Sequence, residues 1–306
     1  MNLSTRSGST YKFRSAVQTN GATSEEGIAL VMLDANGRFK ARLEGGVNGN
    51  VLLRQAQHQR VLDPIAVLDI AKSCVAGKLK NSRQVLLRGA REAKNAMDAN
   101  ALSRVVDNLA ASLRSLPDAS DTDVVRGIEG EAARNYFAAL NLVVREDLRA
   151  TFRLDGRTRR PPRDRFNALL SFLYSMLMND CRSACEAAGL DPQVGYLHVL
   201  RPGRAALALD LMEEFRPMVD RLALTLINRG QLREKDFAER EGGAVLLEGD
   251  ARKSVVIAYQ ERKLEKLTHG LLAQAVPVGV LPLIQARLLA RTIRGESEAY
   301  LPFTVR

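Results

Sequence analysis

GIEGEAARNYF, residues 127–137, lies within a helical pattern that runs from 123 to 150. Ser120 or Asp121 precedes the pattern and suits the N-cap of that helix. Glu129 stands between two glycines, each of which costs about 1 kcal/mol relative to alanine inside a helix. Such a cost is tolerated where a ligand must approach the backbone. The alternative is a surface acid that the helix dipole favours.

Two further stretches, GYLH at 195–198 and ALDLMEEFRP at 208–217, add an imidazole and a group of carboxylates. Asp210 precedes Glu213 by three residues and Glu214 by four. On a helix these spacings place the carboxylates on one face, where like charges repel unless a cation lies among them. The pattern therefore predicts a cation at this face.

The cation is either a metal ion or the guanidinium groups of Arg204 and Arg216. His198 lies just before the carboxylates, whereas His58 and His269 are interpreted as solvated or capping residues. Carboxylates with one imidazole suit Mg²⁺ or Mn²⁺ better than zinc. A lone histidine is more often structural, so the metal site depends on this histidine and the acids acting together.

The composition favours a polyanionic partner. The chain has 306 residues, of which 46% are hydrophobic, and a formal net charge of +10. Such a charge favours nucleic acid or an anionic membrane surface, the alternative being simple solubility. Aromatic residues make up only 5% and tryptophan is absent, which argues against a base-stacking platform for single strands.

The chain shows no sign of membrane insertion or of a disulfide framework. The longest apolar run, 271–284, contains two prolines and is shorter than the roughly 20 residues that span a bilayer. No signal peptide is visible at the N-terminus. Cys74, Cys181 and Cys185 are interpreted as core residues of a protein in a reducing cytoplasm.

The fold predicted is α+β and predominantly α. Residues 1–25 are polar and predicted to be disordered, and residues 26–56 are a small β element. Within it, Asn36-Gly37 separates two strand-like runs and predicts a hairpin. Residues 57–306 are a large helical catalytic domain, although the helical pattern already starts near Val51. Further helices are predicted over 166–188, 207–228 with a break near Pro217, 250–269 and 280–294.

The basic residues form two sets that suggest a track for a phosphate backbone. In the first, Arg145, Arg149 and Arg153 step by four residues and lead into an arginine-rich loop. The second runs from Lys72 to Lys94 along another predicted helix and includes Lys78. A charge run is usually a solvated face, but these two sets flank the candidate metal site.

The motifs together resemble a known family, the CRISPR-associated integrases that insert new spacers into a repeat array. The resemblance covers roughly residues 27–306 and looks closest to members from type I-C systems. The matching segments are GIEGEAARNYF (127–137), RRPPRDRFNALLSFLYSML (159–177), GYLH (195–198), LALDLMEEFRP (207–217), LALTLINRGQL (222–232) and EGGAVLL (241–247).

The resemblance implies a metal site and its chemistry. Glu129, His198 and Glu213 match the family's ligands for Mg²⁺ or Mn²⁺, and Asp210 matches a further acidic catalytic position beside the metal. The family catalyses transesterification, in which the 3′-hydroxyl of a captured DNA fragment attacks a phosphodiester at the repeat edge. It also cleaves double-stranded and branched DNA. Tyr174 is a candidate to line the site.

The resemblance also implies partners. Members act as homodimers, two of which flank a dimer of a small ferredoxin-like subunit. The candidate DNA-contacting residues are Arg126, Arg165, Arg204 and Arg216.

One departure keeps two alternatives open. The family has several strands before the segment that matches Gly27–Leu30, and here a short polar stretch takes their place. The N-terminal β domain therefore looks truncated, which puts dimerisation and integration in question. The alternatives to an integrase are a non-integrating nuclease on branched DNA and a catalytically idle DNA-binding scaffold.

Overall fold

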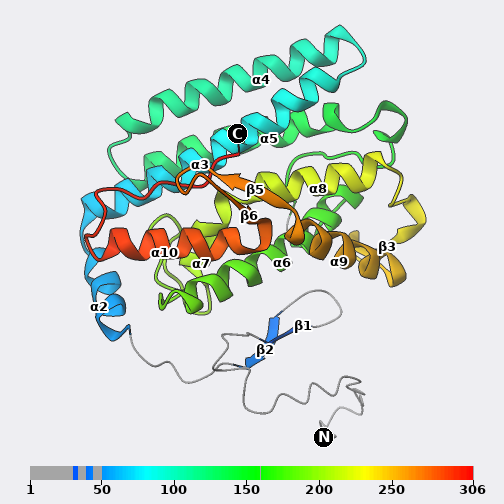
Figure 1. Cartoon of the computed structure of the whole chain (residues 1–306). Coiled ribbons are helices and arrows are strands. Elements are labelled where there is room, and N and C mark those ends of the chain that lie inside the picture. Colours follow the sequence, from blue (N-terminus) through cyan, green and yellow to red (C-terminus); the bar gives the residue numbers. More distant parts are fainter. Residues whose placement is uncertain (1–29, 34–38, 44–49, 159, 306) are drawn as a thin grey trace, which may run out of the picture.

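The computed structural model describes residues 30–33, 39–43, 50–158 and 160–305 (Figure 1). The predicted disordered segment 1–25 and the Asn36-Gly37 turn lie outside these residues. The strands on either side of that turn are present, since β1 (Leu30–Leu33) pairs antiparallel with β2 (Phe39–Leu43).

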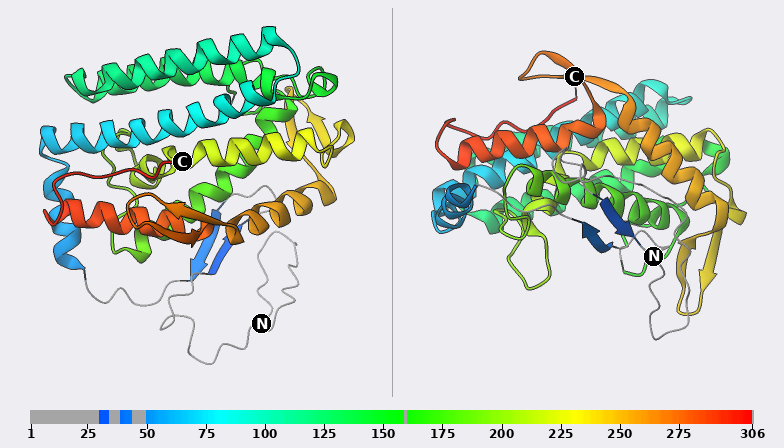
Figure 2. Two further views of the ribbon diagram at one scale, coloured as in Figure 1. Left: turned by 45° about the horizontal axis from the view of Figure 1, so that its top comes forward. Right: turned by 60° about the horizontal axis from the view of Figure 1, so that its bottom comes forward.

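Helices make up most of the described chain, which confirms a predominantly α, α+β fold (Figures 1 and 2). They are α2 (Val51–Arg60), α3 (Pro64–Glu92), α4 (Ala96–Ser115), α5 (Thr122–Val143), α6 (Arg165–Ala187), α7 (Ala206–Glu213), α8 (Arg216–Asn228), α9 (Gly249–Leu264) and α10 (Leu281–Ile293). The boundary predicted at residue 56 falls inside α2.

Two hairpins that the sequence did not predict interrupt the helical part. In one, β3 (Phe237–Arg240) pairs with β4 (Ala244–Leu247). In the other, β5 (Lys266–His269) pairs with β6 (Gln274–Pro277). Among the described residues, no helix combines the length and apolar character needed to cross a bilayer.

Local capping explains where several helices begin and end. Asp121 accepts hydrogen bonds from the backbone of Asp123 and Val124 and thereby starts α5. At the end of α8, Gly230 takes a φ of 69° that favours glycine, and its N–H donates to Ile227 O.

The helix predicted over 123–150 is too long, because α5 ends at Val143. Arg145, Arg149 and Arg153 therefore do not share a helix face. Each is paired with an acid instead: Arg145 with Asp147, Arg149 with Asp98, and Arg153 with Asp155. The spacing of four residues therefore does not place these arginines on one helix. The prediction that this first basic set forms a track for a phosphate backbone is not supported by their arrangement.

The helix predicted over 250–269 is also too long, because α9 ends at Leu264. The chain turns into β5, and His269 is buried with 3% exposure. Its Nε2 lies 2.9 Å from Gln285 Oε1. The interpretation of His269 as a solvated or capping residue is therefore wrong, whereas His58 is exposed as expected.

The long helix α3 is the centre of the packing. It contacts α4 and α5 on one side and α7 and α8 on the other, while α6 packs on α7, α8 and α10. Each of α3, α4 and α5 packs against the other two, so the three helices form one group (Figure 2). The three cysteines are free and buried, as predicted for core residues.

Asp220 ties three helices together inside this core. It lies on α8 and accepts hydrogen bonds from the hydroxyls of Tyr136 on α5, at 2.9 Å, and of Tyr174 on α6. Burial raises the pKa of the Asp220 carboxyl to about 6, although both tyrosines and Arg216 oppose this rise.

We expect the buried carboxyl of Asp220 to make stability depend on pH. The folded protein holds this proton more tightly than the unfolded chain, in which the carboxyl has its ordinary pKa of 3.8. Its stability therefore falls as the pH rises from about 4 to 6. Asp220→Asn removes the titration. From pH 4 to pH 7 the free energy of unfolding of the unmodified protein should therefore fall by about 3 kcal/mol relative to that of the variant. Urea denaturation across this range measures the difference, and a difference that does not change with pH would contradict the account.

Candidate metal and nucleic-acid site

The predicted site residues come from separate segments of the chain. Glu129 lies on α5, Glu213 ends α7, and Arg216 begins α8. His198 lies in the loop between α6 and α7. A Cβ added at either glycine beside Glu129 would meet no atom within 4 Å, so no other part of the described protein presses on the backbone there.

Asp210 organises the GYLH turn. Its carboxylate accepts the backbone N–H groups of Tyr196, Leu197 and His198. The carboxylate is 1% exposed, so these charge-assisted bonds form in the protein interior. Gly195 permits the close approach, because a Cβ at that position would lie 2.6 Å from the carbonyl carbon of Ala206.

Asp210 also orients the imidazole of His198. The Nδ1 of His198 lies 2.7 Å from Asp210 Oδ1. When Nδ1 carries the proton and donates it to Asp210, Nε2 is left as the free lone pair, the form in which histidine binds a metal. Nε2 points to the carboxylate of Glu213, with Oε1 at 3.8 Å.

Glu213 is a buried carboxylate surrounded by cations. It is 4% exposed, and Arg216 Nε donates to its Oε1 at 2.8 Å. Lys78 Nζ lies 2.6 Å from its Oε2. Burial alone would raise the pKa of Glu213, but the charges of Arg216, Lys78 and His198 outweigh burial and lower it.

Lys78 joins the two glutamates of the site. Its ammonium forms ion pairs with both Glu129 and Glu213. Burial disfavours its charge, but the two carboxylates outweigh burial and raise the pKa of Lys78. In the sequence, this lysine stands out only as one of a basic set along the helix. The one indication of its burial was its position four residues after Cys74, which places both side chains on the buried face of α3.

The carboxylates and the imidazole of this site are suitable ligands for a divalent ion, although in this structure the carboxylates bind the ammonium of Lys78. Among the described residues, no three His, Cys, Asp or Glu side chains form a ready metal cluster. The ammonium of Lys78 lies between Glu129 and Glu213 instead. Glu213 Oε2 is buried and has this ion pair but no hydrogen bond. Two carboxylates and an oriented imidazole are ligands that Mg²⁺ or Mn²⁺ accepts.

Tyr174 lies near the site but inside the protein. The guanidinium of Arg216 sits 4.8 Å from the centre of its ring, and the side chain is 6% exposed. Tyr174 therefore supports Arg216 through a cation–π contact and lies beneath the candidate metal ligands.

The four candidate DNA-contacting arginines are all engaged by protein groups. Arg126 pairs with Asp123 and donates to Leu197 O at 2.8 Å, which braces the GYLH turn. The remaining three have these partners: Arg204 donates to Val199 O, Arg165 pairs with Glu234, and Arg216 pairs with Glu213. Arg216 thus belongs to the site, whereas no contact joins Arg165 to it.

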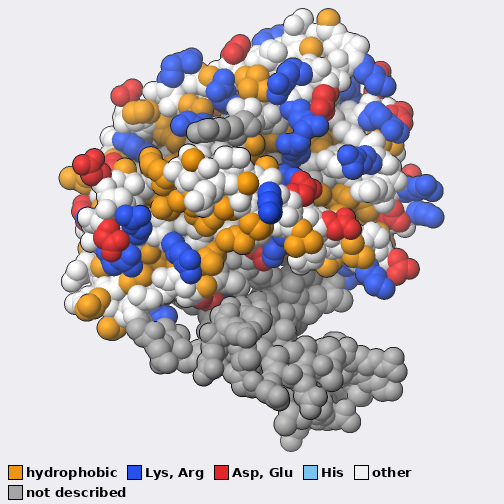
Figure 3. All heavy atoms as spheres, viewed as in Figure 1, with side chains coloured by type: hydrophobic (Ala, Val, Ile, Leu, Met, Phe, Trp, Pro, Cys, Tyr) orange, Lys and Arg blue, Asp and Glu red, His pale blue; other side chains and the backbone are white. Residues whose placement is uncertain are grey.

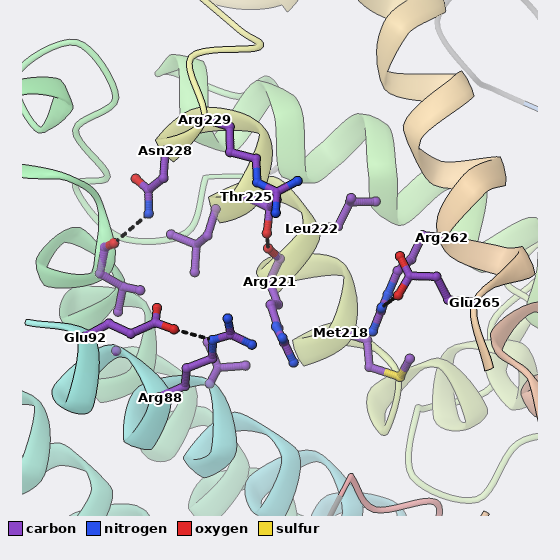
Figure 4. A pocket seen from close by; sticks show the side chains of 14 residues that line it. Arg88, Glu92, Met218, Arg221, Leu222, Thr225, Asn228, Arg229, Arg262 and Glu265 are labelled. Carbon is purple, nitrogen blue, oxygen red and sulfur yellow. Dashed lines mark hydrogen bonds and ion pairs between the residues drawn. The ribbon is translucent and has the colours of Figure 1, made fainter. Parts of the chain in front are cut away.

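A second group of arginines lines a cavity of about 360 Å³ between α3, α8 and α9 (Figure 4). Arg88 and Arg221 extend toward one another across it, and Arg262 reaches in from α9. Arg88 pairs with Glu92, and Arg262 pairs with Glu265. In the described part of the chain, Arg221 and Arg229 have no acidic partner within ion-pair distance. Sequence analysis missed this cavity because three distant segments build it.

The basic side chains on one face of the molecule are mostly dispersed. On the face seen in Figure 3, Lys and Arg side chains lie among acidic and apolar ones, with a close group of basic side chains in the upper half. This face does not present one continuous basic track.

These features define a mainly helical α+β protein with a buried carboxylate–imidazole cluster. The chain belongs to the family described as CRISPR associated protein Cas1, whose family model matches residues 16–261. This membership confirms the resemblance stated from the motifs, at the level of the family.

Individual comparisons agree. The chain is 56% identical to a CRISPR-associated endonuclease Cas1 of Moorella thermoacetica, over 92% of this chain and 82% of that protein. Among solved structures, a casposase bound to integration product is 24% identical, covers 90% of this chain and 75% of its own, and has a TM-score of 0.76. A chain of a Cas6-RT-Cas1–Cas2 complex is 26% identical and has a TM-score of 0.75. The match covers 92% of this chain and 30% of the chain in that complex.

Asp210→Ala is expected to destabilise the GYLH turn. The change leaves three buried backbone N–H groups and the imidazole without their acceptor, at a cost on the order of 3 kcal/mol in the free energy of unfolding. Urea denaturation at neutral pH measures it. His198→Ala removes only one of these contacts and should cost clearly less, so equal losses in the two variants would contradict this role of Asp210.

Proposed function

We propose that the protein is a DNA endonuclease and integrase that uses Mg²⁺ or Mn²⁺ held by Glu129, His198 and Glu213. The observation that carries the proposal is that Lys78 bridges Glu129 and Glu213, while Nε2 of His198 lies 3.8 Å from Oε1 of Glu213. The three proposed ligands come from α5, a loop and α7, in a member of the Cas1 family. The close relative named an endonuclease supports the nuclease activity.

The chain's own residues divide the work at this site. The bound metal would polarise the scissile phosphodiester and stabilise charge on its oxygens. Asp210 keeps the proton of His198 on Nδ1, so that Nε2 stays available. Arg216 neutralises one oxygen of Glu213 and thereby limits the repulsion between Glu213 and Glu129.

The proposed reaction follows from the resemblance and from two neighbours. A 3′-hydroxyl of a captured DNA fragment attacks a phosphodiester at the edge of a repeat. A new phosphodiester joins the fragment to the repeat, and the 3′-oxygen of the flanking strand leaves and becomes a hydroxyl. The structure named as a casposase bound to integration product supports this strand transfer. The complex named with Cas1 and Cas2 supports a partner subunit. The homodimer and the ferredoxin-like fold of the partner are carried over from the family as part of the proposal.

We further propose that the cavity of Figure 4 binds the phosphate backbone of DNA away from the reacting phosphate. Arg221 follows Arg216 by five residues, which is about 140° around a helix with 3.6 residues per turn. The cavity therefore faces away from the metal ligands. Forked guanidinium groups without acidic partners are suited to phosphate oxygens. A branched substrate has a second arm that this cavity would hold.

The metal site is tested by single substitutions. Glu129→Ala, His198→Ala and Glu213→Ala should each lower cleavage of labelled branched DNA in Mn²⁺ by at least about 100-fold, because each removes a ligand for the ion. Gel electrophoresis of the products measures cleavage, and a plasmid that carries a repeat separates strand transfer from hydrolysis.

Glu131→Ala is the matched control. Glu131 lies in the same motif and is exposed, so its removal should leave cleavage unchanged. Cleavage retained in all three ligand variants would refute the proposed site. Cleavage by the unmodified protein without strand transfer would favour the non-integrating nuclease, and DNA binding without any turnover would favour the scaffold.

The cavity is tested by DNA binding without metal. In the double variant Arg221→Gln and Arg229→Gln, the slope of log K against log salt concentration should be smaller in magnitude by about 2, because each phosphate contact contributes about 0.9 to that slope. Fluorescence anisotropy with labelled branched DNA in EDTA measures it. Arg287→Gln with Arg291→Gln, on an exposed face of α10, is the control of equal charge. An equal effect of both pairs would show only a general loss of charge and contradict the cavity.

A further inference from the structure

The atoms that a metal would need at the candidate site are the atoms that Lys78 already uses. Its ammonium contacts Oε1 of Glu129 and Oε2 of Glu213. Oε1 of Glu213 is held by Arg216 at 2.8 Å. Both oxygens of Glu213 are thus engaged by cations, so an ion bound to Glu213 would have to share an oxygen with Lys78 or with Arg216, and Lys78 also occupies Oε1 of Glu129.

Such sharing is electrostatically unfavourable. Two like charges held a few ångströms apart repel one another, and the repulsion doubles when one of them is divalent. Lys78 is 6% exposed, so water screens the repulsion poorly. Lys78 and a divalent ion consequently cannot both occupy this position, and binding of the ion requires the ammonium to leave it.

The lysine has a stabilising role when no metal is present. Without Lys78, Glu129 and Glu213 would face each other with only Arg216 and His198 nearby. Removing one partner of a buried ion pair leaves a charge less well compensated, and this destabilises a protein. The ammonium thus keeps the helices α3, α5 and α7 together around the two carboxylates.

We propose that Lys78 is a built-in competitor of the divalent ion. Its ammonium takes the place of the ion in the metal-free protein, and displacement of the ammonium sets the apparent metal affinity. The inference rests on the proposed metal site and adds a residue that controls how readily the site is filled. A lysine suits this task because its single charge sits on a flexible four-carbon stem that can withdraw.

The test is a calorimetric titration of the full-length protein with Mn²⁺, in the absence of DNA. Lys78→Met keeps the length and apolar stem of the side chain and removes the charge. It should bind Mn²⁺ at least about ten-fold more tightly than the unmodified protein, because no internal cation has to be displaced. The melting temperature of this variant should be lower without metal and should rise more steeply on addition of Mn²⁺.

Two controls isolate the effect. Lys80→Met removes an exposed lysine two residues further along α3 and should bind Mn²⁺ as the unmodified protein does. Lys78→Arg retains the cation and should keep the affinity within a few-fold of the original. An affinity of Lys78→Met that is equal to or weaker than that of the unmodified protein overturns the proposal.

Failure to fold is also informative. If Lys78→Met folds only when Mn²⁺ is present, the ion has replaced the ammonium, as proposed. If millimolar Mn²⁺ does not restore its folding, the proposal is overturned. These readouts are independent of cleavage, so failure of the proposed enzyme activity appears separately, as metal-independent or absent cleavage by the unmodified protein.

Discussion

The buried carboxylate of Glu213 is the constraint on which the rest of the site depends. A charge that is 4% exposed is costly unless other groups compensate it. Lys78 from α3 and Arg216 from α8 supply that compensation, and the loop between α6 and α7 brings Nε2 of His198 to 3.8 Å from the same carboxylate. The charge thereby fixes where these three segments meet, and Glu129 joins them through Lys78. The same interactions that stabilise the packing also assemble the candidate metal ligands.

The next residue, Glu214, shows how strongly position decides the role of an acid. It is fully buried, and it accepts hydrogen bonds from Tyr300, from the backbone of Phe303 and from Gln285. Burial raises its pKa to about 8, opposite to the direction for Glu213. Asn81 on α3 bonds to the carbonyls of both Glu214 and Phe303. One of two adjacent glutamates thus faces cations, and the other attaches the C-terminal segment beside the site.

Local signals in the sequence were sufficient where the structure is local. Asp121 caps α5 as expected, and the break near Pro217 separates α7 from α8. The predictions were wrong where a helical pattern in the sequence continues beyond the residue at which the helix ends. Arg145 and Arg149 keep a helical spacing, yet the chain leaves the helix after Val143. Arg145 pairs with Asp147 two residues further on, and Arg149 pairs with the distant Asp98. His269 lies in a predicted helix but is buried by a hairpin with no strong turn signal.

The helical class, the family and the residues that candidate chemistry requires can all be predicted from the sequence, because periodicity, caps and motifs are carried by neighbouring residues. Which cations contact those residues depends on how distant segments pack. Lys78 and Glu213 are far apart in the chain, and spacing within one segment contains no information about their contact at 2.6 Å. The same limit explains why arginines chosen by motif are bound to protein groups, whereas Arg221 and Arg229 line a cavity. Whether a charge is paired depends on segments brought together by packing, which the linear pattern does not specify.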